Sequence, residues 1–267
     1  MARKTLTAIL VLLASTVLII GCAKKSVSTD WANSFRPLNA RFHRIALFTD
    51  ALVVRHTDFG NMIPMNESLD LSSRIDKEVT EQLSLLNYSV AANEKFFIGA
   101  YGTEPMKVSD DKDTEPGDFN PPFHLDPDVL HSESYSKDVQ QAFKDFAKMI
   151  ADGQAGLGQG RLPESIVGAI SRKYNLDAVA LVIAVSRQPE TKEMYGPLAP
   201  DSVFKYRAPF VAIGVFHGYD GKLLWYGITT YDAPVLPSVL PRAAKDMLAD
   251  FPPKGEGPYF ANPNPEK

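Results

Sequence analysis

The sequence predicts an α/β fold, in which a mixed sheet packs with helices and carries a long irregular insertion. A run with helical spacing from Leu69 to Leu86 lies between two apolar runs of strand length, which is the order of a parallel crossover. Nearer the C-terminus, two β-rich runs meet at Tyr219-Asp-Gly-Lys222, and Asp-Gly between such runs is typical of an antiparallel hairpin. We therefore expect a parallel crossover in the first half and an antiparallel meander in the second half.

The first predicted strand is Arg44 to Thr49, a short apolar run of the kind that forms a buried strand. The next apolar residues, Leu52 to Val54, can extend it, whereas Gly60 and Pro64 interrupt regular structure. After the helix, Tyr88 to Val90 follows at once, as a short strand does after a crossover helix.

The crossover helix has one apolar face, and Asn87 suits the left-handed residue that ends it. For its start the sequence leaves alternatives: Ser68 or Asp70 caps it, or Ser73 and Asp76 form a capping pair in a helix that begins late. The apolar face consists of Ile75, Val79, Leu83 and Leu86.

The insertion spans about 103–160. Its first part, 103–128, is rich in proline and acidic residues, which predicts a surface excursion without regular structure. A helix is predicted from Tyr135 to Ala151, followed by a glycine-rich joint at 153–160. The apolar face of this helix consists of Val139, Phe143, Phe146, Ala147 and Ile150.

The second half is more regular. Pro163 opens a helix that Asn175 ends, and Asp177 to Val185 is apolar on both faces, as an inner strand is. Two strands, a helix and a mobile Pro/Gly-rich tail are predicted to follow, at 210–217, 223–231, 239–251 and 252–267. Aromatic side chains of this half either line a groove or pack against helices, and packing is favoured: Tyr206, Trp225, Tyr226 and Tyr231.

The N-terminus has the pattern of an export signal. Arg3 and Lys4 precede a short apolar run that closes on Gly21-Cys22, and this run is too short for a permanent membrane anchor. The pattern resembles the lipobox of bacterial lipoproteins, although an ordinary cleaved signal or a short transmembrane helix would share some of its features. The resemblance implies a diacylglyceryl thioether on Cys22, with an N-acyl chain such as palmitate.

These features predict the organisation of the chain. Residues 1–21 form the signal peptide, 22–43 the lipidated N-terminus and a tether, and 44–251 a single α/β domain. Similarity to lipoproteins places the protein in the bacterial cell envelope. Ala23 after the cysteine resembles outer-membrane sorting, with the inner membrane as the alternative.

Two stretches of the body resemble a known pattern. Tyr174 to Val182 and Ala212 to Trp225 are similar to the curli-secretion lipoproteins and to the N-terminal α/β domain of the Tol–Pal system's propeller protein. This resemblance also implies a role in the cell envelope.

Charge and cysteine content exclude some functions. Without residues 1–21, 26 basic residues face 32 acidic ones, so the net charge is −6, and the body lacks the basic surface that nucleic acid requires. Cys22 is the only cysteine, so no intramolecular disulfide and no free thiol nucleophile is expected. We expect no cofactor other than the covalent lipid.

Catalytic motifs are absent from the sequence. It has no Gly-x-Ser-x-Gly and no His-Glu-x-x-His, and the glycines at 156, 158 and 160 follow a helix rather than a strand. The best candidate for a metal site groups two imidazoles and two carboxylates within eight residues, with a polar surface loop as the alternative. These residues are His124, Asp126, Asp128 and His131.

The preferred hypothesis is therefore a non-enzymatic, lipid-anchored envelope protein that binds envelope partners or self-assembles, with the membrane contacted through the lipid. Phe143 and Phe146 are its candidate partner-binding residues. The alternative is a metal-binding or metal-assisted hydrolytic envelope protein that uses the segment from His124 to His131.

Overall fold

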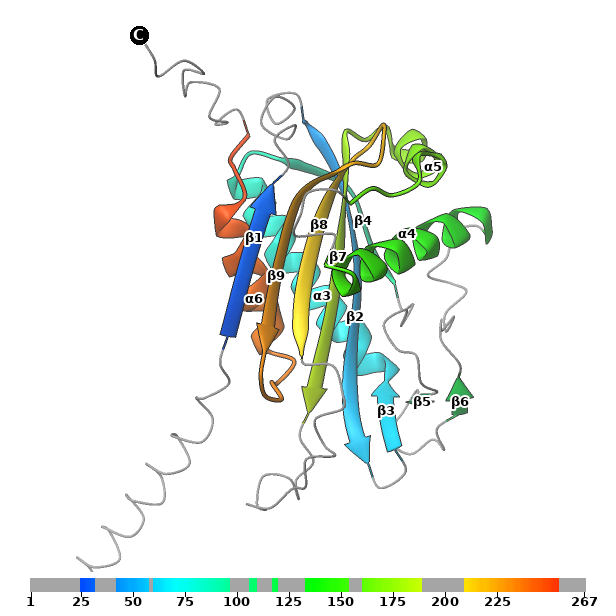
Figure 1. The fold of residues 1–267 in the computed structure, drawn as a ribbon, viewed down its shortest axis with the longest axis vertical. Coiled ribbons are helices and arrows are strands. Elements are labelled where there is room, and N and C mark those ends of the chain that lie inside the picture. Colours follow the sequence, from blue (N-terminus) through cyan, green and yellow to red (C-terminus); the bar gives the residue numbers. More distant parts are fainter. Residues whose placement is uncertain are drawn as a thin grey trace, which may run out of the picture.

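The computed structural model describes residues 25–31, 42–57, 60–96, 106–109, 117–119, 133–153, 160–188 and 209–254. In these ranges the strands form one nine-stranded mixed sheet, with the order β1-β9-β8-β7-β2-β3-β5-β6 and with β4 also paired to β2 (Figure 1). The predicted α/β class is confirmed. The strands are β1 (Lys25–Trp31), β2 (Arg44–Thr57), β3 (Gly60–Pro64), β4 (Ser89–Phe96), β5 (Met106–Ser109), β6 (Gly117–Phe119), β7 (Ala178–Gln188), β8 (Phe210–His217) and β9 (Leu223–Tyr231).

The helices cover both faces of the sheet. The predicted crossover helix is present, and no helix of the described ranges is both long enough and apolar enough to cross a membrane. The helices are α3 (Met65–Leu85), α4 (Glu133–Ala151), α5 (Glu164–Tyr174), α6 (Val239–Met247) and the 3₁₀ turn η5 (Leu248–Asp250).

Strand β2 is the centre of the sheet. It runs parallel to β7 from Ile45 to Arg55, and on its other side it has two different neighbours. Its first part, Arg44–Asp50, pairs parallel with β4, whereas Arg55–Thr57 pairs antiparallel with β3. The side of β2 between these two partners, at residues 51–54, therefore faces no strand within the described part of the chain.

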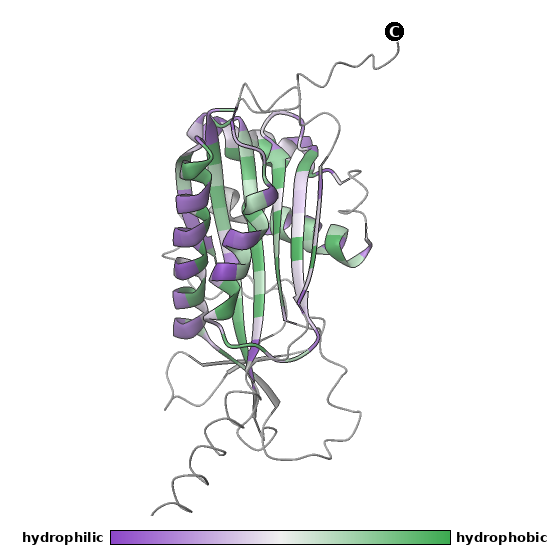
Figure 2. Ribbon diagram, turned by 90° about the vertical axis from the view of Figure 1, so that its left-hand side faces the viewer, coloured by the Kyte–Doolittle hydropathy of each residue, from purple (hydrophilic) through white to green (hydrophobic). Residues whose placement is uncertain are grey.

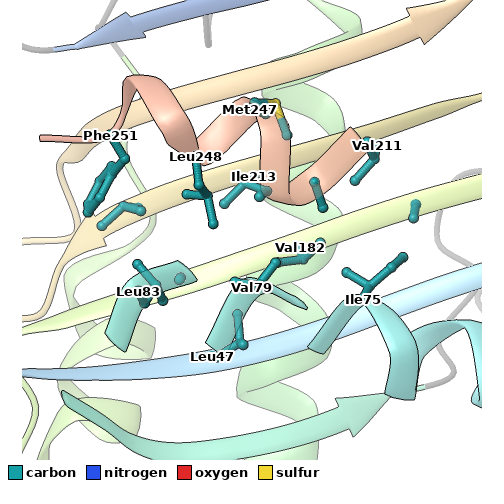
Figure 3. Packing of buried hydrophobic residues seen from close by; sticks show 14 of the residues in the cluster. Leu47, Ile75, Val79, Leu83, Val182, Val211, Ile213, Met247, Leu248 and Phe251 are labelled. Carbon is teal, nitrogen blue, oxygen red and sulfur yellow. The ribbon is translucent and has the colours of Figure 1, made fainter. Parts of the chain in front are cut away.

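One face of the sheet is covered by α3 and α6. Ile75, Val79 and Leu83 of α3 pack on β2 and β7, and Leu248 lies near Ile213 of β8 (Figure 3). Met247 lies against Gly227 and Thr229 of β9. The outward faces of these helices are polar, and their apolar faces point to the sheet (Figure 2). This burial of one helical stripe against a pleated apolar surface is the main favourable term in the fold.

The other face is covered by α4 and α5. Phe143 and Phe146 of α4 are fully buried here, and the ring of Phe146 meets those of Phe216 and Tyr226 edge-on, with centroids 5.4 and 6.3 Å away. A Cβ atom on Gly214 would lie 2.7 Å from the Phe146 ring, so the glycine lets that ring approach the strand backbone.

Several expected loop segments are strands instead. Lys25–Trp31, expected to be part of a tether, forms β1 and pairs antiparallel with β9 over its whole length. Its sequence is polar because this edge strand is held by the backbone ladder and buries little surface, so the apolar pattern of an inner strand is missing. Met106–Ser109 and Gly117–Phe119, expected to be irregular, form the hairpin β5–β6.

The ends of the predicted helices are partly confirmed. Asn87 and Asn175 adopt positive φ, 66° and 52°, as the predicted terminators should. The start of α3 was predicted wrongly, because the helix begins at Met65 after Pro64 and has no side-chain cap. Ser68 lies in its interior, where its hydroxyl accepts a hydrogen bond from strand β2.

The hairpin between β8 and β9 lies where the sequence predicts it, but its turn differs from the two-residue turn with two left-handed residues for which Asp-Gly is typical. Gly221 has a φ of 70°, whereas Asp220 is not in the left-handed region. Four residues lie between His217 and Lys222, whose backbone groups close the loop at 2.9 Å. A loop of this length is built around an ordinary turn and needs one left-handed residue at its end, rather than two in a row.

The C-terminal segment starts as part of the folded body. The Tyr88 hydroxyl donates to the carbonyl oxygen of buried Pro252 at 2.9 Å, and the Lys254 N–H donates to that of Leu86 at 2.9 Å. The mobile tail predicted from Pro252 is therefore wrong for Pro252–Lys254, and its remainder lies outside the described residues.

Candidate functional site

A row of polar side chains is buried between α3 and β2. Ser68, Ser72 and Asp76 are spaced four residues apart on α3, so they lie on one face of the helix, and they are at most 5% exposed. Thr49 of β2, which is fully buried, faces the last of them. We call these four residues the α3 polar row.

The two serines bind residues 51–54 of β2 on the side away from β7, where the described residues place no partner strand. The Ala51 N–H donates to the Ser72 Oγ at 3.1 Å, and the Val53 N–H donates to the Ser68 Oγ at 3.0 Å. The Ser68 hydroxyl in turn donates to the carbonyl oxygen of Pro64 at 2.9 Å. Because buried backbone N–H groups must be paired, the helix supplies the acceptors that a strand would otherwise supply.

Asp76 ends the row as a buried carboxyl. Burial raises its pKa to about 6, although the hydrogen bond that Thr49 donates at 2.8 Å and the positive charge of Lys95 lower it. A carboxyl with this pKa exchanges protons near neutral pH. Its 5% exposure leaves almost no access for a substrate, so the row acts in the structure rather than in a reaction.

A second polar cluster lies at the β8–β9 turn, at the opposite end of the sheet from the start of β1. His217 Nδ1 and Asp220 Oδ1 are 2.8 Å apart, and the Lys222 N–H donates to the same carboxylate oxygen at 3.1 Å. Partial burial alone would raise the pKa of Asp220, but the Lys222 N–H and His217 lower it below its usual value. The cluster fixes the turn, so the role of His217 here is structural.

The described part of the chain offers no metal centre, since no three His, Cys, Asp or Glu side chains gather there. The predicted metal ligands all lie outside the described residues, and so does the lipidation residue Cys22. The predicted ligands are His124, Asp126, Asp128 and His131. The metal hypothesis therefore remains a prediction.

Phe143 and Phe146 were expected to contact a partner, but both are 0% exposed within the chain. Their rings pack on the sheet, Phe143 against Phe96 with centroids 5.8 Å apart. The expectation is corrected, because an apolar helical face can bury itself on the body of its own chain as well as on a partner. The packing predicted for Trp225, Tyr226 and Tyr231 is confirmed by exposed fractions of 1, 6 and 5%.

The structural features that the sequence did not predict include the α3 polar row, β1 and the hairpin β5–β6. The sequence does contain a pattern that indicates the polar row. Ser68, Ser72 and Asp76 recur every four residues on a helix whose other inward positions are apolar. The remaining buried polar side chains include Asp50, Gln140 and Arg187, and each has an interaction within the protein.

Comparison with known proteins identifies no family. No protein-family model matches the chain, and no curated protein matches its sequence. One similar solved structure is the PelC dodecamer from Paraburkholderia phytofirmans, with 10% identity and a TM-score of 0.34, covering 85% of this chain and 96% of that chain. Another is a DUF4136 family protein from Bacteroides thetaiotaomicron, with 11% identity and a TM-score of 0.33. This match covers 85% of this chain and 94% of that chain. Both are bacterial proteins, and likenesses this weak transfer neither assembly nor activity to this chain.

Proposed function

We propose that the protein is a lipid-anchored component of the bacterial cell envelope that acts without catalysis, by binding envelope partners or copies of itself. The observation that carries the proposal is the signal pattern ending at Cys22, followed after only two residues by β1. Seven residues of β1 pair with β9, from Lys25 with Tyr231 to Trp31 with Trp225. A lipid on Cys22 would thus be joined almost directly to the sheet.

The short connection limits how far the body can move from the lipid layer. Three Cα–Cα steps separate Cys22 from Lys25, and at 3.8 Å each they span at most about 11 Å. Two or more acyl chains on one residue hold a protein stably at a membrane, whereas one chain holds it only marginally. The start of β1 would therefore stay within about 11 Å of the lipidated residue, which keeps the folded body next to the membrane surface.

The anchor is tested with Cys22→Ser in whole cells supplied with labelled palmitate. The unaltered protein should incorporate the label and sediment with membranes, and the variant should do neither. Equal labelling and equal fractionation of the two proteins would refute the proposal.

Self-association is tested at β1, because this strand is the last in the sheet order and its outer edge has no partner strand among the described residues. Ser28→Cys places a thiol on this exposed strand, and Lys77→Cys on exposed α3 is the matched control. With Cys22 acylated, the introduced thiol is the only one.

A thiol crosslinker in whole cells should give a dimer with Ser28→Cys and not with Lys77→Cys if copies meet at β1. A heterologous adduct specific to Ser28→Cys would instead support an envelope partner. If neither variant yields any adduct and the protein runs as a monomer, the binding role is wrong.

A further inference from the structure

One end of the sheet is tied to the anchor. Lys25, the first residue of β1, pairs with Tyr231, the last residue of β9, so their Cα atoms lie about 5 Å apart. The loop 232–238 begins at the next residue and leads to α6. In Figure 1 this loop extends past the start of β1 at the same end of the sheet.

The loop presents apolar side chains to solvent. Leu236 is 54% exposed and Val239, the first residue of α6, is 38% exposed. They are two of the five exposed large apolar side chains of the described ranges. Of the other three, Val27 lies on β1, whereas Leu85 and Tyr219 lie at the opposite end of the sheet.

Two hydrogen bonds hold the loop in the conformation that exposes Leu236 and Val239. The Ser186 hydroxyl donates to the carbonyl oxygen of Val235 at 2.9 Å, and the Val235 side chain is buried beneath the loop. The Val239 N–H donates to the carbonyl oxygen of Leu236 at 3.0 Å, which closes a turn between the two exposed residues. The loop cannot turn these side chains inward without breaking these contacts.

The loop also carries little charge. From residue 233 to residue 239 the sequence is Ala-Pro-Val-Leu-Pro-Ser-Val, and Asp232 is the only charged residue between β9 and α6. On the adjoining β1, Lys25 contributes a positive charge, 3.5 Å from Asp246 of α6. Asp246 balances this charge, so the apolar side chains of the turn, rather than the lysine, suit this end of the sheet to the boundary between head groups and acyl chains.

We infer that the end of the sheet carrying Lys25 and the loop 232–238 faces the membrane, and that Leu236 and Val239 enter its interfacial layer. The inference rests on the proposed lipid at Cys22, because the link of about 11 Å brings this end to the membrane. The opposite end, with Tyr219 at the β8–β9 turn, then faces away from the lipid layer.

The experiment uses the full-length lipidated protein with a single introduced thiol at Leu236→Cys, Val239→Cys or Tyr219→Cys. Tyr219, 75% exposed at the opposite end, is the matched control. Each thiol carries an environment-sensitive fluorophore. The proteins are reconstituted into vesicles of phosphatidylethanolamine and phosphatidylglycerol, with and without brominated acyl chains, which quench fluorophores that reach them. Flotation first establishes that each protein is bound to the vesicles.

The expected result is a blue-shifted emission and strong quenching at residues 236 and 239, with neither at residue 219. Vesicle-bound protein with equal quenching at the three positions, or with none at 236 and 239, overturns the orientation while the anchor stands. Lipidated protein that fails to float overturns the proposed anchor, and the orientation with it.

Discussion

The hydroxyl oxygen of Ser72 accepts a hydrogen bond from the backbone N–H of Ala51 at 3.1 Å. A carbonyl group of a neighbouring strand would ordinarily be the acceptor. Strand β4 pairs with β2 only as far as Asp50, and β3 begins its pairing at Arg55. The residues between them would leave buried N–H groups unpaired. Helix α3 therefore completes the hydrogen bonding of the central strand as well as covering it.

Replacing Ser72 with alanine should destabilise the protein by about 1–3 kcal/mol, because a buried N–H loses its acceptor. The free energy of unfolding from urea titration measures this. Ser84→Ala is the matched control, since Ser84 lies on the same helix but is exposed and donates only to the carbonyl oxygen of Thr80. Equal stability of the two variants would show that Ser72 is not needed by β2.

Asp76 makes the stability depend on pH. Its pKa of about 6 in the folded protein exceeds the ordinary 3.8, so the folded state holds a proton that the unfolded state releases. The protonated Asp76 therefore contributes to the free energy of unfolding. This contribution is fully present below about pH 4 and is lost as the pH rises to about 6. Two pKa units correspond to about 3 kcal/mol.

Asp76→Asn should therefore match the unaltered protein near pH 4 and be more stable by up to about 3 kcal/mol above pH 7, since its amide oxygen can still accept from Thr49. Denaturation at several pH values checks this. Asp70→Asn, at an exposed position of the same helix, controls for the loss of a carboxylate. A stability difference independent of pH would contradict the raised pKa.

The contact between Gly214 and Phe146 should tolerate no added methyl group. Gly214→Ala should cost about 1–3 kcal/mol by overpacking. The cost should shrink in a Phe146→Ala background, where the ring is gone, and a double-mutant cycle measures this coupling.

Gly168→Ala serves as the control for this cycle, because it lies in α5 and its added Cβ would meet only the flexible end of Arg172. It should be neutral or stabilising by about 0.5–1 kcal/mol. Additive effects of the Gly214 and Phe146 changes would rule out the contact.

Alanine substitutions at Gly221 and Gly153 distinguish the cost of backbone strain from the cost of a steric clash. Both have positive φ, 70° and 69°, but a Cβ on Gly221 would lie 2.3 Å from the carbonyl oxygen of Leu162, whereas one on Gly153 would meet nothing within 4 Å. Gly153→Ala should cost about 1–2 kcal/mol from φ alone. Gly221→Ala should lower the melting temperature clearly further, and equal effects would refute the clash.

Elements with strong local signals could be predicted from the sequence. The apolar period of α3 and the asparagines at 87 and 175 predicted the helices and their C-terminal ends, because periodicity and positive-φ residues report local conformation. Strand β1 could not be found, since its backbone pairing with a strand nearly two hundred residues away leaves no pattern in its own side chains. The serines at 68 and 72 do recur at helical spacing, but their partners could not be predicted, because these exist only where β3 and β4 leave a gap along β2.

The candidate site was less predictable. The amphipathic face with Phe143 and Phe146 predicted burial correctly, but a pattern cannot tell whether the covering surface belongs to the same chain or to a partner. The lipidation of Cys22 rests on a local pattern that the cell reads before folding, so that prediction stands on the sequence alone.

The position of β1 at the start of the body has a mechanical consequence. Any pull between a membrane-held Cys22 and the rest of the molecule would pass along the axis of β1 into its ladder with β9. Force in this direction shears the seven pairs together instead of unzipping them one after another. An outermost strand that buries few apolar side chains can therefore resist such a pull, because all of its hydrogen bonds must break at once.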